Sequence, residues 1–512
     1  MDSKPFQFDD VYQSTKQYGL YQFCLLLLIQ YACINIAGNY VFMSFGGLQP
    51  TLSCTDTNET FATMDSSVCE KIENCTNLKS ENVFHSLYDD FDLGCQFDWV
   101  PGLLASMQMA ASGFGELIGG HIGDYFGRKW TIYSGYAGML FSGLLCGLAP
   151  NWQILLIGLT VQGFLFGFQW STHFTYVSET VGKKYRILQS CAFQWSLAFQ
   201  LDALIAYWTG NWRVYLLVIN SICLPVTVIM YFLYVESPRW LIQKGRLSEA
   251  AVALNRLAKF NGQQTKFEPE WLSQIDEGQR TKYTVWHLFS SRQLAAYSIV
   301  QAVTGVATES IPGVILFNVQ DLAGSPFVNV CLYGTLRLWT PIFMVLMERK
   351  TQWFGRRALF LESQGFVSLC FLLIIVIHLA GYQTELKLLS TVLALLGATV
   401  NVGMVWTVYK QYTTELYPTV MRAIAVGTFT VISVSGMALA PMMVYLRKYW
   451  SALPYAGAAL VASSSLVLGF FILPETRNVP LPDAIPVPLS TEASQNTLLD
   501  TEKTDENQIC RL

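Results

Sequence analysis

Long apolar runs alternate with short polar segments along most of this 512-residue chain. A helix needs about 20 mostly apolar residues to cross a bilayer, and it must satisfy its backbone polar groups internally. The pattern predicts twelve spans, over 20–45, 100–122, 130–149, 152–177, 188–209, 214–235, 294–318, 326–347, 358–380, 388–412, 424–446 and 451–473. We therefore expect an all-α polytopic membrane protein.

The spacing of these runs divides the chain into five parts. We expect a cytosolic N-terminus over 1–19, a six-helix bundle over 20–235 with an extracellular loop over 46–99, a cytosolic linker over 236–293, a second six-helix bundle over 294–473 and a mostly disordered cytosolic tail over 474–512. In the linker, LSEAAVALNRLAKF has the apolar spacing of a surface helix. Along the second span and just beyond it, Gly115, Gly119, Gly123 and Gly127 recur every four residues, which predicts a face for close helix packing.

Composition and charge agree with a membrane setting and add an orientation. Hydrophobic residues make up 52% of the chain and charged residues 13%, against roughly a quarter charged in soluble domains. The start, MDSKPFQFDD, lacks the basic region and apolar core of a cleaved signal peptide. With both termini in the cytosol, cytoplasmic segments hold roughly 24 of the 32 Lys and Arg residues, so the positive-inside rule favours this orientation. We expect a multi-pass protein of the plasma membrane.

The loop over 46–99 has the composition of an extracellular segment. It contains four cysteines, Cys54, Cys69, Cys75 and Cys95, and two N-x-S/T glycosylation acceptors, Asn58 and Asn74. Disulfides and N-glycans both belong to an oxidising compartment. Four cysteines allow three pairings, and all three are open at this point.

The two halves of the chain repeat charged motifs at matching places. The spacing of Tyr176, Glu179 and Arg186 in YVSETVGKKYR is that of Tyr412, Glu415 and Arg422 in YTTELYPTVMR. Likewise, FGRKW follows the second span and FGRRA the eighth, while ESPRW follows the sixth and PETRN the twelfth. Parallel six-span repeats of this kind are the plan of the major facilitator transporters.

The repeated charges lie where spans leave the membrane on the cytosolic side, which predicts a gate. The candidate gating residues are Asp124, Arg128, Glu179, Arg186, Glu236, Arg239, Arg356, Glu415, Arg422 and Glu475. Guanidinium–carboxylate pairs among them would latch the two halves together and would break when the cavity opens inward. The alternative, that these charges only set topology, explains the bases but not acids at matched spacing.

Further motifs resemble a known family. GGHIGDYFGRKW, YVESPRWLI, ETVGKKYR, TELYPTVMR and LPETRNVPLP, with the cysteine-rich loop, resemble the organic cation, organic anion and carnitine transporters, solute carrier family 22 of the major facilitator superfamily. The resemblance implies twelve helices, alternating access and a polyspecific central cavity for small organic ions, with no nucleotide site. By the same resemblance, the substrate-binding positions are Trp170, Gln194, Phe327, Trp406 and Thr407. Aromatic walls suit organic cations and amphiphiles.

The chain departs from that family where substrate charge is decided. Members commonly carry an acid or a base in span eleven, but Val434 stands at that place. The common glutamate of span eight is replaced by Arg337. The sign of the substrate's charge must therefore be argued from this chain's own intramembrane charges.

Four charged residues lie within predicted spans, Asp202, Glu309, Arg337 and Lys410, of which Lys410 is close to the cytosolic end of its span. Glu116 and His173 lie nearer the cytosolic halves of theirs. An intramembrane charge costs several kcal/mol or more unless it is paired or faces water, so each is a functional candidate. Internal pairing, of Glu309 with Arg337 or of Lys410 with Glu415, is the structural alternative. Asp202 has no basic residue within two turns and is the leading candidate for a substrate ammonium.

Three functions remain open. The first is transport of organic cations or zwitterions, with Asp202 and Glu309 facing the cationic group. The second is organic anion exchange, with Arg337 and Lys410 as the anion site. The third is a non-transporting receptor or scaffold with the same fold. We expect no enzyme activity, cofactor, metal, nucleotide or nucleic-acid partner, because no nucleophile–base pair, metal-ligand cluster or phosphate-binding loop is present in the sequence.

Overall fold

A computed structural model of the chain describes residues 16–54, 59–61, 75, 78–182, 185, 195–273, 284–350, 355–418 and 421–476. The first group of long helices is α2 (Leu20–Gly46), α5 (Val100–Phe126), α6 (Arg128–Gly147), α7 (Trp152–Glu179), α9 (Trp195–Thr209), α10 (Trp212–Ile222) and α11 (Leu224–Leu233). The second group is α15 (Arg292–Phe317), α16 (Pro326–Lys350), α17 (Arg356–Leu379), α18 (Lys387–Val400), α19 (Trp406–Glu415), α20 (Arg422–Tyr445) and α21 (Leu453–Ile472). Each of the twelve predicted spans contains a described helix.

Two spans are interrupted for local reasons. The sixth span divides at Cys223, where Pro225 opens α11, because proline supplies no backbone N–H to continue the preceding helix. The tenth span contains a π-helical turn, η4 (Asn401–Val405), between α18 and α19. Such π-bulges in α-helices are frequent at functional sites.

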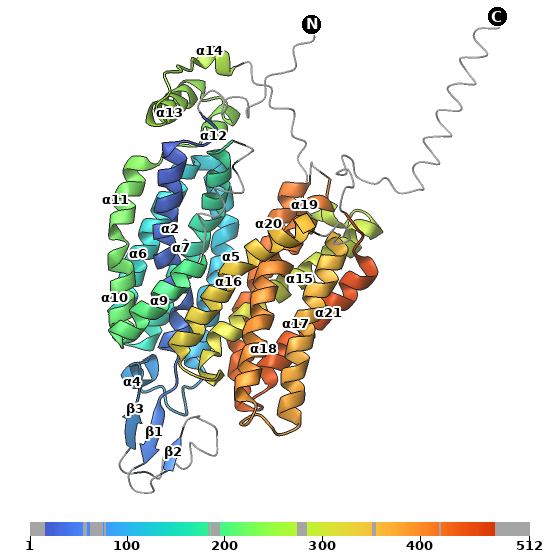
Figure 1. Cartoon of the computed structure of the whole chain (residues 1–512). Coiled ribbons are helices and arrows are strands. Elements are labelled where there is room, and N and C mark those ends of the chain that lie inside the picture. The colour runs from blue at the N-terminus through green and yellow to red at the C-terminus, as the bar shows by residue number, and fades with distance from the viewer. Residues whose placement is uncertain are drawn as a thin grey trace, which may run out of the picture.

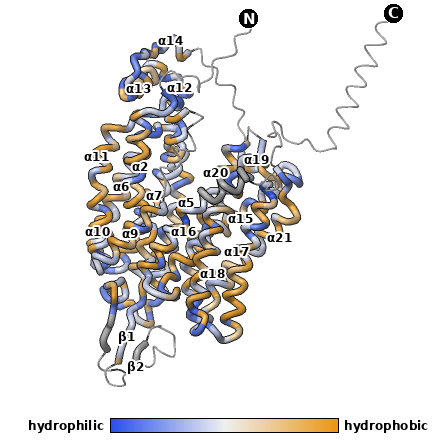
Figure 2. The backbone as a smooth tube through the Cα atoms, in the orientation of Figure 1, coloured by the Kyte–Doolittle hydropathy of each residue, from blue (hydrophilic) through white to orange (hydrophobic). Residues whose placement is uncertain are grey.

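Hydrophobic residues dominate the long helices, as the orange colour of Figure 2 shows. Eight described helical segments are long and apolar enough to cross a membrane by length and composition alone. The predicted spans that fall short lie in α5, α6, α9 and α16. Of these, α5, α6 and α16 are rich in glycine or polar residues, and α9 begins beside residues outside the described ranges. The sequence pattern therefore predicts four spans that a single threshold of helix length and hydrophobicity does not identify.

The helices form two bundles that lie side by side (Figure 1). We call α2 to α11 the N-half and α15 to α21 the C-half. Between the halves, α5 packs beside α20 and α9 packs beside α16. These two contacts place the second and eleventh spans, and the fifth and eighth, along a shared interface.

One end of the molecule, here called the linker end, carries α12 (Pro238–Gln243), α13 (Leu247–Phe260) and α14 (Pro269–Leu272) (Figure 1). The predicted surface helix is α13, which buries Ala250, Leu254 and Leu257. Asn261, which follows α13, accepts the backbone N–H of Tyr21 at 2.9 Å and so satisfies a free donor in the first turn of α2. The linker helices are thereby attached to the N-half.

The opposite end, here called the sheet end, carries a small sheet that the all-α prediction did not include (Figure 1). Its strands are β1 (Thr51–Cys54), β2 (Glu59–Phe61) and β3 (Leu78–Glu81), antiparallel in the order β2-β1-β3. A disulfide joins Cys54 to Cys75. This bond is present in one of the three pairings that the four cysteines of the loop allow. Cys95 is also disulfide-bonded. Cys69, Asn58 and Asn74 lie outside the described residues.

A short helix, α4 (Leu87–Phe91), attaches this loop to the N-half. Asp90 at its end pairs with Arg213 at 2.6 Å and accepts the indole N–H of Trp212 at 2.9 Å. Burial tends to raise the pKa of the Asp90 carboxyl, but hydrogen bonds from His85 and Arg213 outweigh that effect and hold the pKa below its ordinary value. Short 3-10 turns complete the fold at η2 (Val285–Phe289), η3 (Val319–Asp321) and η5 (Leu446–Lys448).

Candidate functional site

At the linker end of the N-half, the predicted gating charges form a compact cluster around Arg128. Its guanidinium donates from Nε and Nη2 to the two carboxylate oxygens of Glu179, each at 3.3 Å, and it also pairs with Asp124. The Arg128 side chain is only 7% exposed. A buried guanidinium needs such charge-assisted partners to offset its desolvation.

Glu236 completes this cluster by capping a helix. Its carboxylate accepts the backbone N–H groups of Arg128 at 2.7 Å and Lys129 at 3.1 Å, the first two residues of α6. A carboxylate at this position satisfies free donors and complements the positive end of the helix dipole. The preceding Gly127 has a φ of +117° and lies against Glu236, so a side chain there would be both strained and obstructed.

The C-half repeats the arrangement at the same end. Arg356 pairs with Glu415 at 3.6 Å. Glu475 accepts the backbone N–H groups of Arg356 at 2.8 Å and Arg357 at 3.1 Å, the first two residues of α17. The hydroxyl of Tyr412 donates to the carbonyl of Pro474 at 2.9 Å.

The matching contact in the N-half runs from the Tyr176 hydroxyl to the carbonyl of Val235, also at 2.9 Å. In the same way, Ser237 donates to Glu179 and Thr476 donates to Glu415. The predicted sequence repeat is thus realised as two equivalent clusters, one in each half.

The ion pairs described in these two clusters do not join the halves, so the latch between the halves stays a prediction. Arg128 pairs with Asp124 and Glu179 within the N-half, and Arg356 pairs with Glu415 within the C-half. Arg422 has Nε and Nη2 buried without a hydrogen-bond partner among the described residues, Arg239 lies in α12 at the same end, and Arg186 lies outside the described ranges.

Midway along the helices, charged residues of both halves approach one another. Glu116 of α5 lies within electrostatic range of Lys410 in α19 and Glu309 in α15. Glu309 in turn lies within range of Lys410 and of Arg337 in α16. Glu309, Arg337 and Lys410 are all partly exposed, whereas Glu116 is 8% exposed. The set contains two acids and two bases and is therefore balanced in formal charge.

The predicted internal ion pairs of this set are not formed. Among the described residues, Glu309 makes no direct ion pair with either base. Lys410 donates to the hydroxyl of Thr430 at 3.1 Å and lies over the Trp406 ring at 5.5 Å, while Glu415 pairs with Arg356 instead.

Aromatic side chains lie beside the charges in the N-half. The ring of Trp170 lies 5.4 Å from that of Trp195, which lies 5.1 Å from Tyr40. The guanidinium of Arg337 lies 5.5 Å from the Phe199 ring across the interface. Tyr40 is also within electrostatic range of Glu309, which joins the aromatic and charged groups into one region.

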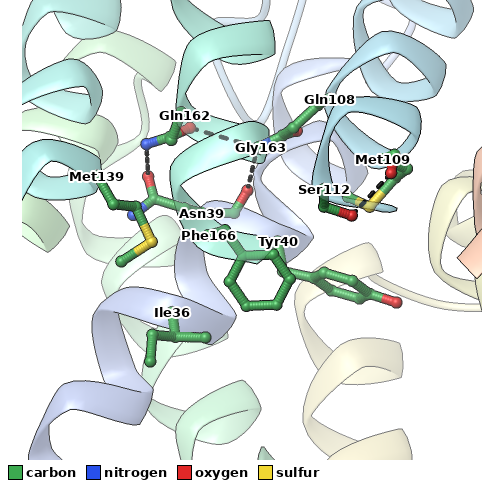
Figure 3. Close-up of a pocket in the computed structure, with 10 residues that line it drawn as sticks. All are labelled: Ile36, Asn39, Tyr40, Gln108, Met109, Ser112, Met139, Gln162, Gly163 and Phe166. Carbon is green, nitrogen blue, oxygen red and sulfur yellow. Dashed lines mark hydrogen bonds between the residues drawn. The ribbon is translucent and has the colours of Figure 1, made fainter. Parts of the chain in front are cut away.

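Tyr40 also lines a small, mostly apolar pocket that was not predicted, whose walls include the amide side chains of Asn39, Gln108 and Gln162 (Figure 3). There, Gln162 donates to the side-chain oxygen of Asn39 at 2.8 Å, and Gln108 donates to the backbone carbonyl of Asn39 at 3.1 Å. The Gln108 side-chain oxygen is buried without a partner among the described residues. Uncharged amides inside predicted spans were the signal that could have indicated this pocket.

Asp202 does not face this region, which corrects its assignment as the substrate's partner. It is 0% exposed, and a side chain at Gly38 would lie 3.0 Å from one of its oxygens, so it points into the N-half toward α2. At 3.6 residues per turn, Asp202 lies about 200° around α9 from Gln200, which donates to Thr335 of α16 at 3.1 Å. Residue counting along the chain cannot show which face of a helix meets the other half.

The remaining predicted positions are distributed along the molecule. Phe327 is not at the centre but at the sheet end, where it stacks on Phe45 with 5.4 Å between ring centroids. Trp406 and Thr407 lie one turn before Lys410 in α19, and Gln194 lies outside the described residues. His173 is fully buried and bonded to Tyr234 at 2.7 Å, which is an internal packing role.

Two matched six-helix halves, with a charged and aromatic region between them, define a membrane transporter. A family model described as "Sugar (and other) transporter" matches residues 51–485. The chain belongs to this family, whose members share the major facilitator fold.

Curated relatives confirm the resemblance to solute carrier family 22. Organic cation/carnitine transporter 2 of Rattus norvegicus is 27% identical over 427 residues, covering 81% of this chain and 74% of that protein. Solute carrier family 22 member 4 of Mus musculus is 26% identical over 410 residues, covering 78% and 71%. An organic cation transporter-like protein of Drosophila melanogaster is 25% identical over 431 residues, covering 78% and 72%. These relatives are named as transporters, not enzymes.

The fold has solved counterparts. The inward open conformation of the xylose transporter XylE from E. coli is similar with a TM-score of 0.59 and 14% sequence identity, covering 90% of this chain and 98% of that one. At this identity, the likeness establishes the fold alone.

Proposed function

We propose that this transporter carries organic cations or zwitterions across the plasma membrane by alternating access, with Glu309 as the group that meets the substrate's cationic centre. The proposal rests on the surroundings of the Glu309 side chain. It is partly exposed between the halves, and it has no direct ion pair among the described residues. Because an intramembrane carboxylate is costly without a partner, a substrate ammonium would supply the missing counter-charge.

The surroundings of Glu309 support a substrate that is cationic or has charges of both signs. Trp170 and Trp195 offer apolar and π surface for an alkylammonium group. Arg337 and Lys410 balance the two acids and would meet a substrate carboxylate. The relatives named as organic cation and carnitine transporters agree with this class of substrate.

For orientation, we propose that the sheet end is extracellular and that both termini are cytosolic. The distribution of Lys and Arg supports this arrangement. So does the disulfide between Cys54 and Cys75, because disulfides persist in oxidising compartments.

The test measures tetraethylammonium uptake by cells expressing the Glu309→Gln variant. This change keeps the shape of the side chain and removes its charge, so the apparent affinity should fall by about tenfold or more, equivalent to about 1.4 kcal/mol. Glu385→Gln, at an exposed acid between α17 and α18, serves as the matched control and should leave uptake unchanged.

Two outcomes would replace the proposal. If Glu309→Gln leaves tetraethylammonium uptake intact while Arg337→Gln abolishes uptake of para-aminohippurate, the protein is an organic anion exchanger. The partial exposure of both Arg337 and Lys410 is the observation that favours this second candidate. If the wild type moves neither probe, nor carnitine, ergothioneine or urate, the non-transporting alternative gains support.

A further inference from the structure

The two halves are joined at the sheet end by an ion pair. Lys448, which follows α20 in the C-half, lies with its Nζ 2.7 Å from Oδ2 of Asp98, which precedes α5 in the N-half. The Tyr445 hydroxyl donates to the other oxygen of Asp98 at 3.4 Å. The side chain of Asp98 is 7% exposed and that of Lys448 is 27% exposed. An ion pair so shielded from water is screened less than a surface pair.

A second set of contacts crosses the halves beside this pair. Arg447 donates to the side-chain oxygen of Gln49 at 2.8 Å, and the backbone N–H of Gln49 donates to Gln320 at 2.9 Å. Arg447 is itself held by Asp321 of the C-half at 2.9 Å. Gln49 follows α2, so the ends of the first and second spans both contact the C-half here.

Aromatic side chains also make contact between the halves at the sheet end. Phe327, the second residue of α16, stacks on Phe45 and also contacts Tyr207 with 5.8 Å between ring centroids. The Phe327 side chain is buried, at 5% exposure. Separating the halves at the sheet end would expose this ring and break the Asp98–Lys448 pair together.

We propose that Asp98 and Lys448 form the closing ion pair of a gate at the sheet end, and that this pair must break before the site between the halves can open on that side. The linker end shows the contrast, because the ion pairs described there lie within single halves. Loss of the pair therefore shifts the equilibrium toward the state open at the sheet end, since it removes an interaction made in only one state. This inference concerns the opening motion and is independent of the substrate's identity.

The experiment uses Phe327→Cys in the full-length chain as a reporter of opening. The purified protein is treated in detergent with a water-soluble maleimide, and the rate of labelling is followed by mass. Detergent makes both ends accessible, so the result does not depend on orientation. The chain with Phe327 intact gives the background from the native free cysteines.

In the reporter background, Asp98→Asn and, separately, Lys448→Gln should each raise the labelling rate at least threefold. The reversed pair, Asp98→Lys with Lys448→Asp, should bring the rate back toward the parent value. Glu249→Gln, which breaks an exposed pair with Arg246 at the linker end, should leave the rate unchanged. All variants are compared as monodisperse samples with a cooperative melting transition.

The proposal is overturned if both neutral variants label at the parent rate. It is also overturned if the reversed pair labels as fast as Asp98→Asn, because local disturbance rather than loss of the ion pair would then explain the increase. Neither result bears on Glu309, so failure of the gate and failure of the proposed function are distinguishable.

Discussion

Single carboxylates at the linker end act on backbone donors as well as on side chains. Glu236 and Glu475 each accept two successive backbone N–H groups at the start of a transmembrane helix. These donors have no partner within their own helices, so a carboxylate from another segment is needed to satisfy them. The acids of ESPRW and PETRN are therefore structural caps that attach the end of each half to its third helix.

This role predicts the cost of removing one cap. Glu236→Ala leaves the first N–H groups of α6 without their acceptor, so the protein should lose about 1–2 kcal/mol of stability. Glu249→Ala removes an exposed pair with Arg246 and should cost only about 0–1 kcal/mol. Thermal unfolding of the purified variants checks the difference, and equal melting temperatures would contradict the cap.

A change at Glu309 is also expected to weaken substrate binding, because its proposed role depends on the negative charge of the side chain and not on its shape. The loss of tetraethylammonium affinity in Glu309→Gln follows from removing one counter-charge in a partly desolvated region. Glu236 and Glu475 thus cap helices at the linker end, whereas Glu309 is proposed to contact the substrate at the centre of the molecule.

Between elements, the closest packing joins α5 and α7. A Cβ added at Gly115 or Gly119 of α5 would overlap backbone atoms of α7, and one added at Gly163 or Gly167 of α7 would overlap backbone atoms of α5. The predicted close-packing face is present at Gly115 and Gly119, where glycines of α7 complete it, but Gly127 lies against Glu236 instead of α7. Neither backbone can yield without moving a whole helix.

Gly167→Ala should therefore abolish most of the folded yield, because its new methyl group would meet the carbonyl of Ser112. Gly365→Ala, in α17, is the matched control, since nothing lies within 4 Å of a Cβ at that position. Fluorescence-detected size exclusion of tagged variants measures the yield of monodisperse protein. Equal yields for the two variants would show that α5 and α7 separate easily.

On the scale of the whole molecule, the ends differ in how they join the halves. Among the described residues, the Asp98–Lys448 ion pair and the Arg447–Gln49 hydrogen bond join the halves at the sheet end, whereas the ion pairs of the two linker-end clusters lie within single halves. This asymmetry is expected of a transporter whose structure is closed at the sheet end. The linker helices, attached through Asn261, are expected to move with the N-half.

Orientation in the membrane is predicted to follow the same two ends. If the sheet end is extracellular, an endoglycosidase should increase the electrophoretic mobility of protein made in the secretory pathway. The double variant Asn58→Gln with Asn74→Gln should abolish that shift. A wild type that carries no glycan would contradict the proposed orientation, whereas loss of only part of the shift would indicate a further glycosylated site.

The number and order of the spans and the repeat of the charged motifs could all be predicted from the amino-acid pattern. Apolar length and motif spacing are local properties that a chain must carry to satisfy its backbone in a membrane. For this reason all twelve predicted spans contain helices, and Tyr176 and Tyr412 make equivalent bonds. The resemblance to solute carrier family 22 rested on the same local motifs.

The residues that meet across the two halves could not be predicted from the sequence and became clear from the folded arrangement of the helices. Asp202 and Gln200 are two positions apart, yet one points into the N-half and the other contacts α16, because helix rotation has meaning only relative to neighbours. The same holds for Phe327 at the sheet end and for the pairing of Asp98 with Lys448, residues 350 positions apart. Contacts between distant segments depend on how the two halves pack, and no local spacing in the chain encodes that packing.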